Sequence, residues 1–355
     1  MFAPCRGVDQ GMLENIDALL GQDYPDYEVI FIVDEETDEA TDVIEAAWRE
    51  ARRQVKLVVA PKTTDSSQKV ANLREGVLYA EETSEVFVFV DSDARPSRRW
   101  LRSLTAALSN QDVGVATGYR WFFSRQVTFA SEMRSVWNAS IVSALGPNRK
   151  SNFCWGGSTA IRRDVFEKLN IRERWRGTFS DDFTMTRIVN EAGLDIVFVP
   201  AALVASVGSC TAGELLEFTT RQMKITRVYA PNLWTRSLIG SALFTIVMLS
   251  AMLIMMLNPR NDITVVIAMF TLLAVTTLSM GKSWVRLNAV GLALPQYNVA
   301  LQRQFIPQIT LWALTPPLFF VNCIAAWTSR RVSWRGTKYE MISPTETKVL
   351  TSGAV

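Results

Sequence analysis

The chain has 355 residues, of which 48% are hydrophobic, with 37 Lys and Arg, 35 Asp and Glu, and no His. Without an imidazole, the sequence excludes zinc sites with His ligands, Ser-His-Asp triads and Cys-His pairs. Residues 236–355 contain ten basic and three acidic residues, net +7, whereas residues 1–235 carry net −5. Because the acidic N-terminal part contains no dense basic stripe, a nucleic-acid partner is not expected.

Residues 1–235 are predicted to form an α/β domain with a Rossmann-like, mostly parallel sheet. Short apolar runs rich in β-branched and aromatic residues are typical of strands that are buried on both faces. The expected elements are strands at 28–33, 55–60 and 86–90 and helices at 37–53 and 66–80. Their alternation along the chain favours parallel pairing of the strands.

Acidic residues follow two of these strands, at the edge where α/β sheets bind ligands. Asp34 follows the first strand, and Asp91 and Asp93 follow the last. If the chain stays extended, these last two carboxylates lie about 6.6 Å apart and repel each other by roughly 2.5 kcal/mol. Bound Mg²⁺ or Mn²⁺ would remove this repulsion, since both prefer carboxylate and phosphate oxygens. A solvated turn is the alternative for an isolated Asp-Ser-Asp motif.

Residues 236–340 are predicted to form an α-helical membrane region. Its three stretches without a charge, 237–259, 263–281 and 304–329, are long enough to cross a ~30 Å hydrocarbon core. The third contains Pro307, Pro316 and Pro317, so it is either a span or a re-entrant hairpin. Buried core helices of a soluble protein are the alternative for all three. Residues 341–355 are predicted to be a tail that is frayed from Ser343.

Several motifs follow one another in the order found in inverting nucleotide-sugar glycosyltransferases of the GT-A fold. They are Pro4-Cys5-Arg6-Gly7, the run 22–30, Lys69-Val70-Ala71-Asn72-Leu73, Asp91-Ser92-Asp93, Gly156-Gly157-Ser158 and Ser180-Asp181-Asp182. Up to about residue 340 the sequence resembles family 2-type glycosyltransferases, in particular the ceramide glucosyltransferase branch and its bacterial lipid-glycosylating relatives. The run Trp334-Arg335-Gly336-Thr337-Lys338-Tyr339 also resembles that branch.

The resemblance implies a UDP-sugar site at the acidic edge of the sheet. Asp34 would contact the uracil or ribose, with Lys69 and Asn72 near it. Asp93, with Asp91 beside it, would hold a divalent cation on the diphosphate and so neutralise the leaving group. The alternative for Lys69 is a solvated lysine on a helix.

The resemblance also implies which residues face the acceptor. Gly156, Gly157 and Ser158 would let the backbone approach the sugar and the acceptor, because glycine has no Cβ; a simple turn is the alternative. Asp182, with Asp181 beside it on the acceptor side, would be the catalytic base in a chain without His. The pair opens an expected helix at 183–192, so stabilisation of the helix N-terminus is the alternative.

One motif departs from the family pattern. The family's Gln/Arg-x-x-Arg-Trp element corresponds to Arg221-Gln222-Met223-Lys224-Ile225 here. Arg221 and Lys224 would still place charge near the donor diphosphate, but Lys cannot form a bidentate pair and Ile offers no aromatic face. Basic residues that flank a membrane span are the alternative. Relatives also carry an N-terminal membrane helix and a full first strand, so we expect either that the chain begins late or that the gene start is misplaced.

The sequence therefore predicts an integral membrane glycosyltransferase with its catalytic domain on the cytosolic face. The resemblance implies transfer of a hexose, glucose from UDP-glucose, to a lipid hydroxyl such as that of ceramide, with inversion. The alternatives are a processive polysaccharide synthase and an inactive membrane scaffold with the same fold.

Overall fold

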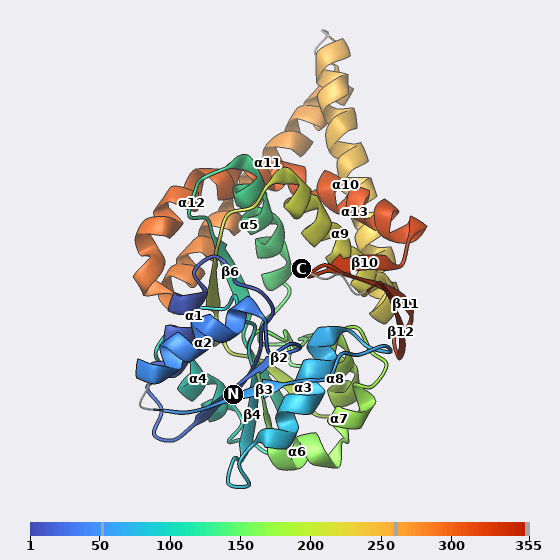
Figure 1. Ribbon diagram of the computed structural model, residues 1–355. Helices are drawn as coiled ribbons and strands as arrows, with labels where there is room; N and C mark the ends of the chain where they lie inside the picture. The colour runs from blue at the N-terminus through green and yellow to red at the C-terminus, as the bar shows by residue number, and fades with distance from the viewer. Residues whose placement is uncertain (51–52, 259–261, 352–355) are drawn as a thin grey trace. The chain divides into compact units, whose positions relative to one another are not determined.

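The computed structural model describes residues 1–50, 53–258 and 262–351. The chain forms two compact units (Figure 1). The first contains Met1–Gln126, Ala139–Ser209 and Arg330–Val355, and the second contains Val127–Asn138 and Cys210–Ser329. The predicted domain limits at residues 235 and 340 differ from this division. The second unit already includes the chain from Cys210 onward, and the segment after residue 329 packs with the N-terminal unit.

A seven-stranded sheet with the strand order β3-β2-β1-β4-β7-β5-β8 forms the centre of the first unit. Its strands are β1 (Phe2–Pro4), β2 (Glu28–Val33), β3 (Gln54–Val59), β4 (Val86–Phe89), β5 (Val113–Thr117), β7 (Thr159–Arg162) and β8 (Asp195–Phe198). Only β7 is antiparallel to its neighbours, β4 and β5. This confirms the predicted α/β class with a mostly parallel sheet, and the three predicted strands correspond to β2, β3 and β4.

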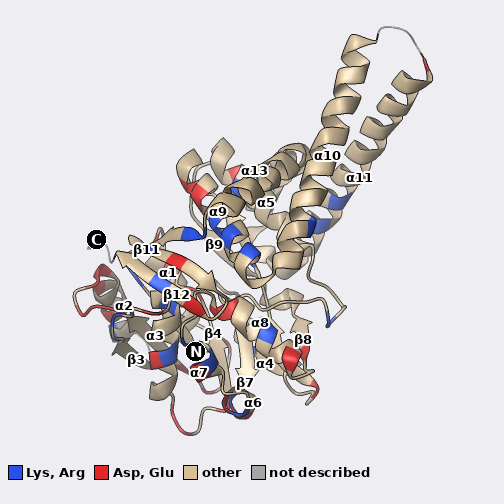
Figure 2. Ribbon diagram, turned by 90° about the vertical axis from the view of Figure 1, so that its right-hand side faces the viewer, with Lys and Arg blue, Asp and Glu red and all other residues tan. Residues whose placement is uncertain are grey.

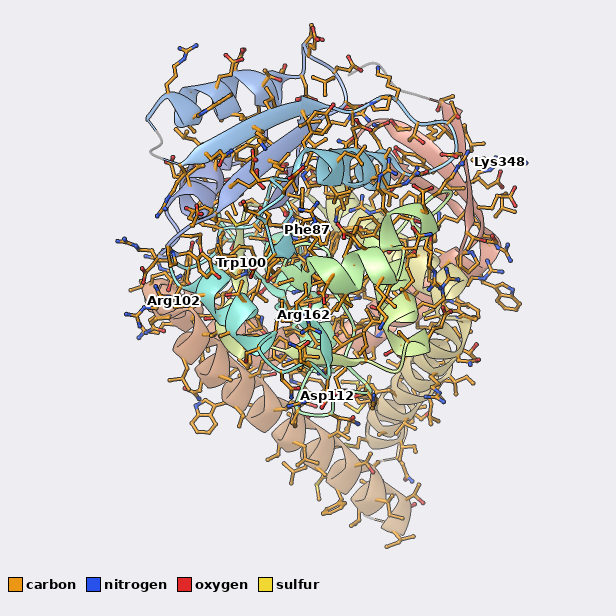
Figure 3. All side chains as sticks on the ribbon, turned by 90° about the horizontal axis from the view of Figure 1, so that it is seen from below. Phe87, Trp100, Arg102, Asp112, Arg162 and Lys348 are labelled. Carbon is orange, nitrogen blue, oxygen red and sulfur yellow. The ribbon has the colours of Figure 1, made fainter. Side chains whose placement is uncertain are left out.

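Helices connect the strands of this sheet. They are α1 (Met12–Leu20), α2 (Glu39–Glu50), α3 (Gln68–Gly76), η1 (Val77–Tyr79), α4 (Trp100–Ala107), α6 (Arg163–Lys168), α7 (Ile171–Arg174), α8 (Asp181–Glu191) and η2 (Pro200–Ala202). The predicted helix 37–53 corresponds to α2, and its residues 51–52 lie outside the described residues. Apolar side chains such as Phe87 and Trp100 are buried in this unit (Figure 3).

Two smaller sheets complete the first unit. One is the parallel pair β6 (Arg120–Phe123) and β9 (Val204–Val207). The other is the antiparallel sheet β10 (Arg331–Trp334), β11 (Thr337–Ser343) and β12 (Glu346–Thr351). The expected frayed tail is therefore wrong up to Thr351, and residues 352–355 lie outside the described residues. The segment is ordered because it has its own core contacts: Tyr339 and Met341 are completely buried.

The second unit is helical. Its elements are the first part of α5 (Phe129–Val142), followed by α9 (Ala212–Tyr229), α10 (Pro231–Leu257), α11 (Ile263–Ala293), η3 (Pro295–Tyr297), α12 (Asn298–Thr310), η4 (Leu311–Leu314) and α13 (Thr315–Thr328). Among the described residues, three helical stretches are long and apolar enough to cross a membrane: Pro231–Leu257, Ile263–Ala293 and Pro295–Thr328. Charged residues are sparse along α10 and α11 (Figure 2).

These helices contain most of the predicted spans. The span predicted at 237–259 falls in α10, although Pro259 itself lies outside the described residues. The stretch predicted at 304–329 is divided between α12, η4 and α13. Pro316 and Pro317 lie in the first turn of α13, where a backbone N–H has no partner within the helix.

Candidate active site

The acidic edge of the sheet is built from strands that pair directly. Phe89 of β4 lies opposite Thr159 of β7, and β7 is antiparallel to β4. The residues that follow β4 therefore meet the residues that precede β7, so Asp91 and Gly157 become neighbours. A Cβ on Gly157 would lie 2.7 Å from Asp91 Oδ2.

Lys69 lies in the first turn of α3, whose N-cap is Ser67. Its Nζ is 2.7 Å from Asp91 Oδ1 and 3.3 Å from Asp181 Oδ1. All three side chains are at most 20% exposed, so solvent screens these ion pairs only weakly. Lys69 is therefore not a solvated lysine on a helix, and its predicted place near the uracil or ribose of the donor stays a prediction.

Gly156 leaves the space into which this cluster fits. A Cβ at Gly156 would lie 2.1 Å from Asp181 Oδ2 and 2.9 Å from Lys69 Nζ. Real Cβ atoms do not approach other atoms so closely, so any larger residue would displace the Asp181 carboxylate. The predicted Gly-Gly motif thus has a physical reason in this fold, namely the close approach of backbone to the carboxylates on both sides.

The protonation preferences within the cluster follow from burial and from the two ion pairs. Burial acts to lower the pKa of Lys69, but the attraction of Asp181 and Asp91 outweighs burial and raises this pKa. Burial acts to raise the pKa of Asp91, but Lys69 and Arg120 hold it below its ordinary value. At Asp181 burial wins over the attraction of Lys69 and raises the pKa to about 6.

Asp93 has a different environment from Asp91. Its Oδ2 lies 3.6 Å from Arg120 Nη1, and burial raises the pKa of its carboxyl. The Arg120 guanidinium also lies over the ring of Trp155, 5.0 Å from the centroid. Arg120 was not predicted from the sequence, since an arginine at the start of a strand carries no signal that it will meet a carboxylate 27 residues earlier.

The condition that Asp91-Ser92-Asp93 stays extended is not met. The chain turns after β4, and the N–H of Ala94 donates to the carbonyl of Asp91 at 3.1 Å. Each carboxylate then has its own cation, Lys69 for Asp91 and Arg120 for Asp93. These two protein cations offset the repulsion from which we argued for a bound metal.

The residues nonetheless fit a hard divalent cation. Asp93 Oδ1 is buried and has no hydrogen-bond partner among the described residues. Within the described ranges, no group of three His, Cys, Asp or Glu side chains could hold a metal ion by itself. Asp93 and Asp91 would therefore supply part of the ligand set, and diphosphate and water oxygens the rest, which is the usual arrangement for Mg²⁺.

Asp182 lies at the start of α8, as predicted. The N-cap is Ser180, whose hydroxyl accepts from the N–H of Phe183 at 3.3 Å, and Asp181 and Asp182 occupy the first two helical positions. Asp182 Oδ1 accepts from the Phe183 N–H at 2.7 Å and from the Ser180 hydroxyl. Asp182, Asp181 and Gly156 together line a small cavity.

Three other predicted site residues have partners within the protein. Asp34 is 6% exposed, its Oδ2 lies 3.5 Å from Arg6 Nη1, and burial raises the pKa of its carboxyl. Asn72 donates to the carbonyl of Ile32 at 3.4 Å. Ser158 donates to the carbonyl of Ala202 at 3.0 Å, so its hydroxyl supports the turn before β7.

Arg221 and Lys224 lie on α9 of the second unit. The Arg221 guanidinium lies 5.9 Å from the ring centroid of Phe218, and burial lowers the pKa of Lys224. Their predicted contact with the donor stays a prediction.

Three solved structures of glucosyl-3-phosphoglycerate synthase from Mycobacterium tuberculosis are similar to the chain, each over 64% of its length. One matches at 15% identity and a TM-score of 0.39, covering 78% of that protein. A second, in complex with Mg²⁺ and UDP, matches at 14% and 0.38, covering 76%. A third, with phosphoglyceric acid, matches at 13% and 0.36, covering 77%.

The sequence model described as "Glycosyl transferase family 21" matches residues 1–346. This range includes every motif that forms the acidic edge and most of the C-terminal sheet. The chain belongs to glycosyl transferase family 21.

Proposed function

We propose that the chain transfers a hexose, glucose from UDP-glucose, to the hydroxyl of a membrane lipid such as ceramide, with inversion at the anomeric carbon. The observation that carries this proposal is the cluster of Lys69, Asp91 and Asp181 around Gly156, with Asp182 beside it. The long apolar helices of the same chain support a lipid acceptor, since an acceptor with two acyl chains stays in the membrane.

Asp182 is the proposed catalytic base. It would accept the proton of the acceptor hydroxyl while the acceptor oxygen bonds to the anomeric carbon. The bond between that carbon and the β-phosphate oxygen breaks in the same step, and UDP leaves with the bonding electron pair. Attack from the face opposite the leaving group inverts the anomeric configuration.

Charge at the leaving group is the second requirement of this reaction. A divalent cation held by Asp93 and Asp91 would neutralise the departing diphosphate when bound. Lys69 fixes the Asp91 carboxylate from one side, and the Ala94 N–H fixes the backbone of the turn from the other. The positive charge of Arg120 offsets the repulsion between the carboxylates of Asp93 and Asp91. These contacts hold the carboxylates in place before the donor arrives, so that little reorganisation accompanies binding.

The proposal is tested with the full chain in detergent or lipid discs, supplied with radiolabelled UDP-glucose with and without a lipid extract. We expect one labelled sugar per lipid, separated by thin-layer chromatography, and UDP release that depends on lipid. A long labelled polymer would instead identify a processive synthase. No transfer and no UDP release with any UDP-sugar would identify an inactive scaffold and overturn the proposal.

A further inference from the structure

The turn between β10 and β11 has an unusual residue in a strained position. Trp334 pairs with Thr337, so the two strands are joined by Arg335 and Gly336 alone. Both have positive φ, +48° and +76°, as a type I′ hairpin turn requires. Asn, Asp and Gly are preferred in this turn, and a left-handed conformation costs other residues about 1–2 kcal/mol. Such a cost at one residue points to a function for its side chain.

The hairpin is held firmly on the first unit. Arg6 donates to the Thr337 hydroxyl at 3.1 Å, and the N–H of Gln68 donates to the Tyr339 hydroxyl at 3.3 Å. Gly177, with φ +76°, lies against the turn between β11 and β12, where a Cβ would meet the Thr345 carbonyl at 2.4 Å. Gln68 and Thr337 are themselves buried. The turn is therefore a fixed part of the acidic edge.

Arg335 projects from this turn towards the acidic edge. Its guanidinium pairs with Asp9, which also accepts from the Ser92 hydroxyl at 3.4 Å. Ser92 stands between Asp91 and Asp93, and the positive charge of Arg335 stabilises both of these carboxylates. Thus the fold brings a residue from the end of the chain to the motif that follows β4.

Three cations near the Asp91-Ser92-Asp93 motif, Lys69, Arg120 and Arg335, are held in different ways. Lys69 lies between two carboxylates, and Arg120 pairs with Asp93 and lies over an aromatic ring. Within the described part of the chain, Arg335 has one side-chain partner, Asp9, and its side chain is 33% exposed. Of the three, Arg335 has the most exposed side chain, 33% against 19% for Lys69 and 13% for Arg120, so it can most easily exchange its carboxylate for an incoming anion.

We propose that Arg335 binds the diphosphate of the nucleotide-sugar donor, exchanging its ion pair with Asp9 for phosphate oxygens. The proposal rests on the proposed nucleotide-sugar donor. A guanidinium can form two parallel hydrogen bonds to a phosphate, which fixes the orientation of the group as well as its charge. The C-terminal sheet then completes the donor site. The left-handed turn between β10 and β11 directs the Arg335 side chain towards that site.

The decisive variant is Arg335→Asn. Asn-Gly is the most favourable pair for a two-residue hairpin, so this change removes the guanidinium and favours the turn. The full chain is titrated calorimetrically with UDP and with uridine, which lacks phosphate, in the presence of Mg²⁺. We expect UDP binding to weaken roughly 10- to 100-fold and uridine binding to be unchanged. Arg335→Lys should recover part of the loss, since it keeps the charge without the planar fork.

Two controls separate this role from a structural one. Arg331→Ala removes an exposed arginine of the same hairpin, paired with Glu340 at 3.5 Å, and should leave UDP binding unchanged. Asp9→Asn breaks the ion pair but leaves Arg335 in place, so it should not weaken UDP binding. Equal losses in Asp9→Asn and Arg335→Asn, or equal losses for UDP and uridine, would overturn the proposal. If the wild-type chain binds no UDP, the proposed donor fails instead.

Discussion

Lys69 Nζ lies 2.7 Å from Asp91 Oδ1, so the first turn of α3 supplies a cation to the acidic motif after β4. The same nitrogen reaches the Asp181 carboxylate at the start of α8. One lysine thus joins the segment expected to bind the diphosphate to the segment that holds the proposed base. Lys69 therefore contributes to the stability of the first unit and fixes the positions of the Asp91 and Asp181 carboxylates.

Replacing Lys69 by Met should destabilise the first unit by about 3 kcal/mol, because two largely buried carboxylates lose their shared cation. The free energy of unfolding is measured with denaturant in detergent. Lys62→Met is the matched control, since Lys62 pairs with Glu35 at the surface and should contribute at most about 1 kcal/mol. Similar losses in both variants would contradict the buried role of Lys69.

The contribution of Asp181 to the free energy of unfolding should fall as the pH rises from 4 to 6. Burial raises the pKa of this carboxyl from 3.8 to about 6, so in this range the folded chain holds a proton that the unfolded chain releases. The stabilisation is complete below pH 4 and is lost as the pH rises through 6, by on the order of 2–3 kcal/mol.

Asp181→Asn lacks this proton exchange and isolates the effect from that of Asp91, whose pKa is shifted in the opposite direction. Melting temperatures of the two proteins are compared across pH 4–7 with EDTA present. The wild type should lose stability relative to Asp181→Asn as the pH rises. A difference that does not change with pH, or one of opposite slope, would refute the assignment.

Asp93→Ala should abolish transfer, because Asp93 is the proposed principal anchor of the cation. UDP affinity, measured by calorimetry with Mg²⁺, should fall at least about tenfold in the variant. With excess EDTA the wild type and the variant should bind UDP alike, which separates loss of the cation from damage to the fold. Full turnover of the wild type in excess chelator would rule out the cation requirement and leave Arg335 and Lys69 as the charges that face the diphosphate.

The elements that could be predicted from the sequence are those determined by residues adjacent along the chain. The strands β2 and β4 are continuous apolar runs, and the start of α8 follows Ser180, a good N-cap. The contact of Lys69 with Asp91 and Asp181 depends on the pairing of distant segments, which hydrophobic periodicity does not encode. The condition of an extended Asp-Ser-Asp motif is not met, because hydrogen bonding after β4 closes a turn.

The C-terminal sheet was missed for a related reason. Its strands alternate charged and apolar residues, as in Thr337–Ser343, and their apolar face is buried against a unit that begins more than 300 residues earlier. The motif around Arg335 was recognised by its resemblance, but its place beside Asp9 was not predictable from the sequence. A left-handed arginine in a two-residue turn is visible only in the structure.

The same sheet constrains the membrane topology. Met1–Gln126 and Arg330–Val355 belong to one compact unit, so both must lie on the same face of the membrane. The chain between them then crosses an even number of times. We predict that α10 and α11 cross, and that α12 and α13 do not. The stretch Pro295–Thr328 that contains them is long enough to cross, but a third crossing would place Arg330–Val355 on the opposite face from Met1–Gln126.

Cysteine labelling tests this topology. The native cysteines are all buried, so a membrane-impermeant maleimide should react only with introduced ones. In intact cells Leu257→Cys, at the end of α10, should react, and Lys348→Cys, on β12, should react only after permeabilisation. Labelling of both positions from outside would contradict an even number of crossings. Labelling of Lys348→Cys alone would place the catalytic unit outside the cytosol.

The last prediction separates catalysis from helix stabilisation at Asp182. Since Ser180 is the N-cap, Asp182 contributes to the helix through its charge near the N-terminus and its bond to the Phe183 N–H. Asn keeps the shape and most of this stabilisation but cannot accept the proton of the acceptor. Turnover of Asp182→Asn should therefore fall by roughly 10²- to 10⁴-fold, with little change in melting temperature or UDP affinity.

Asp164 provides a matched control for this prediction. It lies in the first turn of α6, and its Oδ1 accepts from the Val165 N–H at 2.8 Å, much as Asp182 accepts from Phe183 at 2.7 Å. Asp164→Asn therefore removes an equivalent helix charge away from the acidic edge and should leave turnover unchanged. Wild-type turnover in Asp182→Asn would show that the carboxylate serves the helix alone, and the proton would then have to go to Asp181, whose pKa of about 6 suits a base near neutral pH.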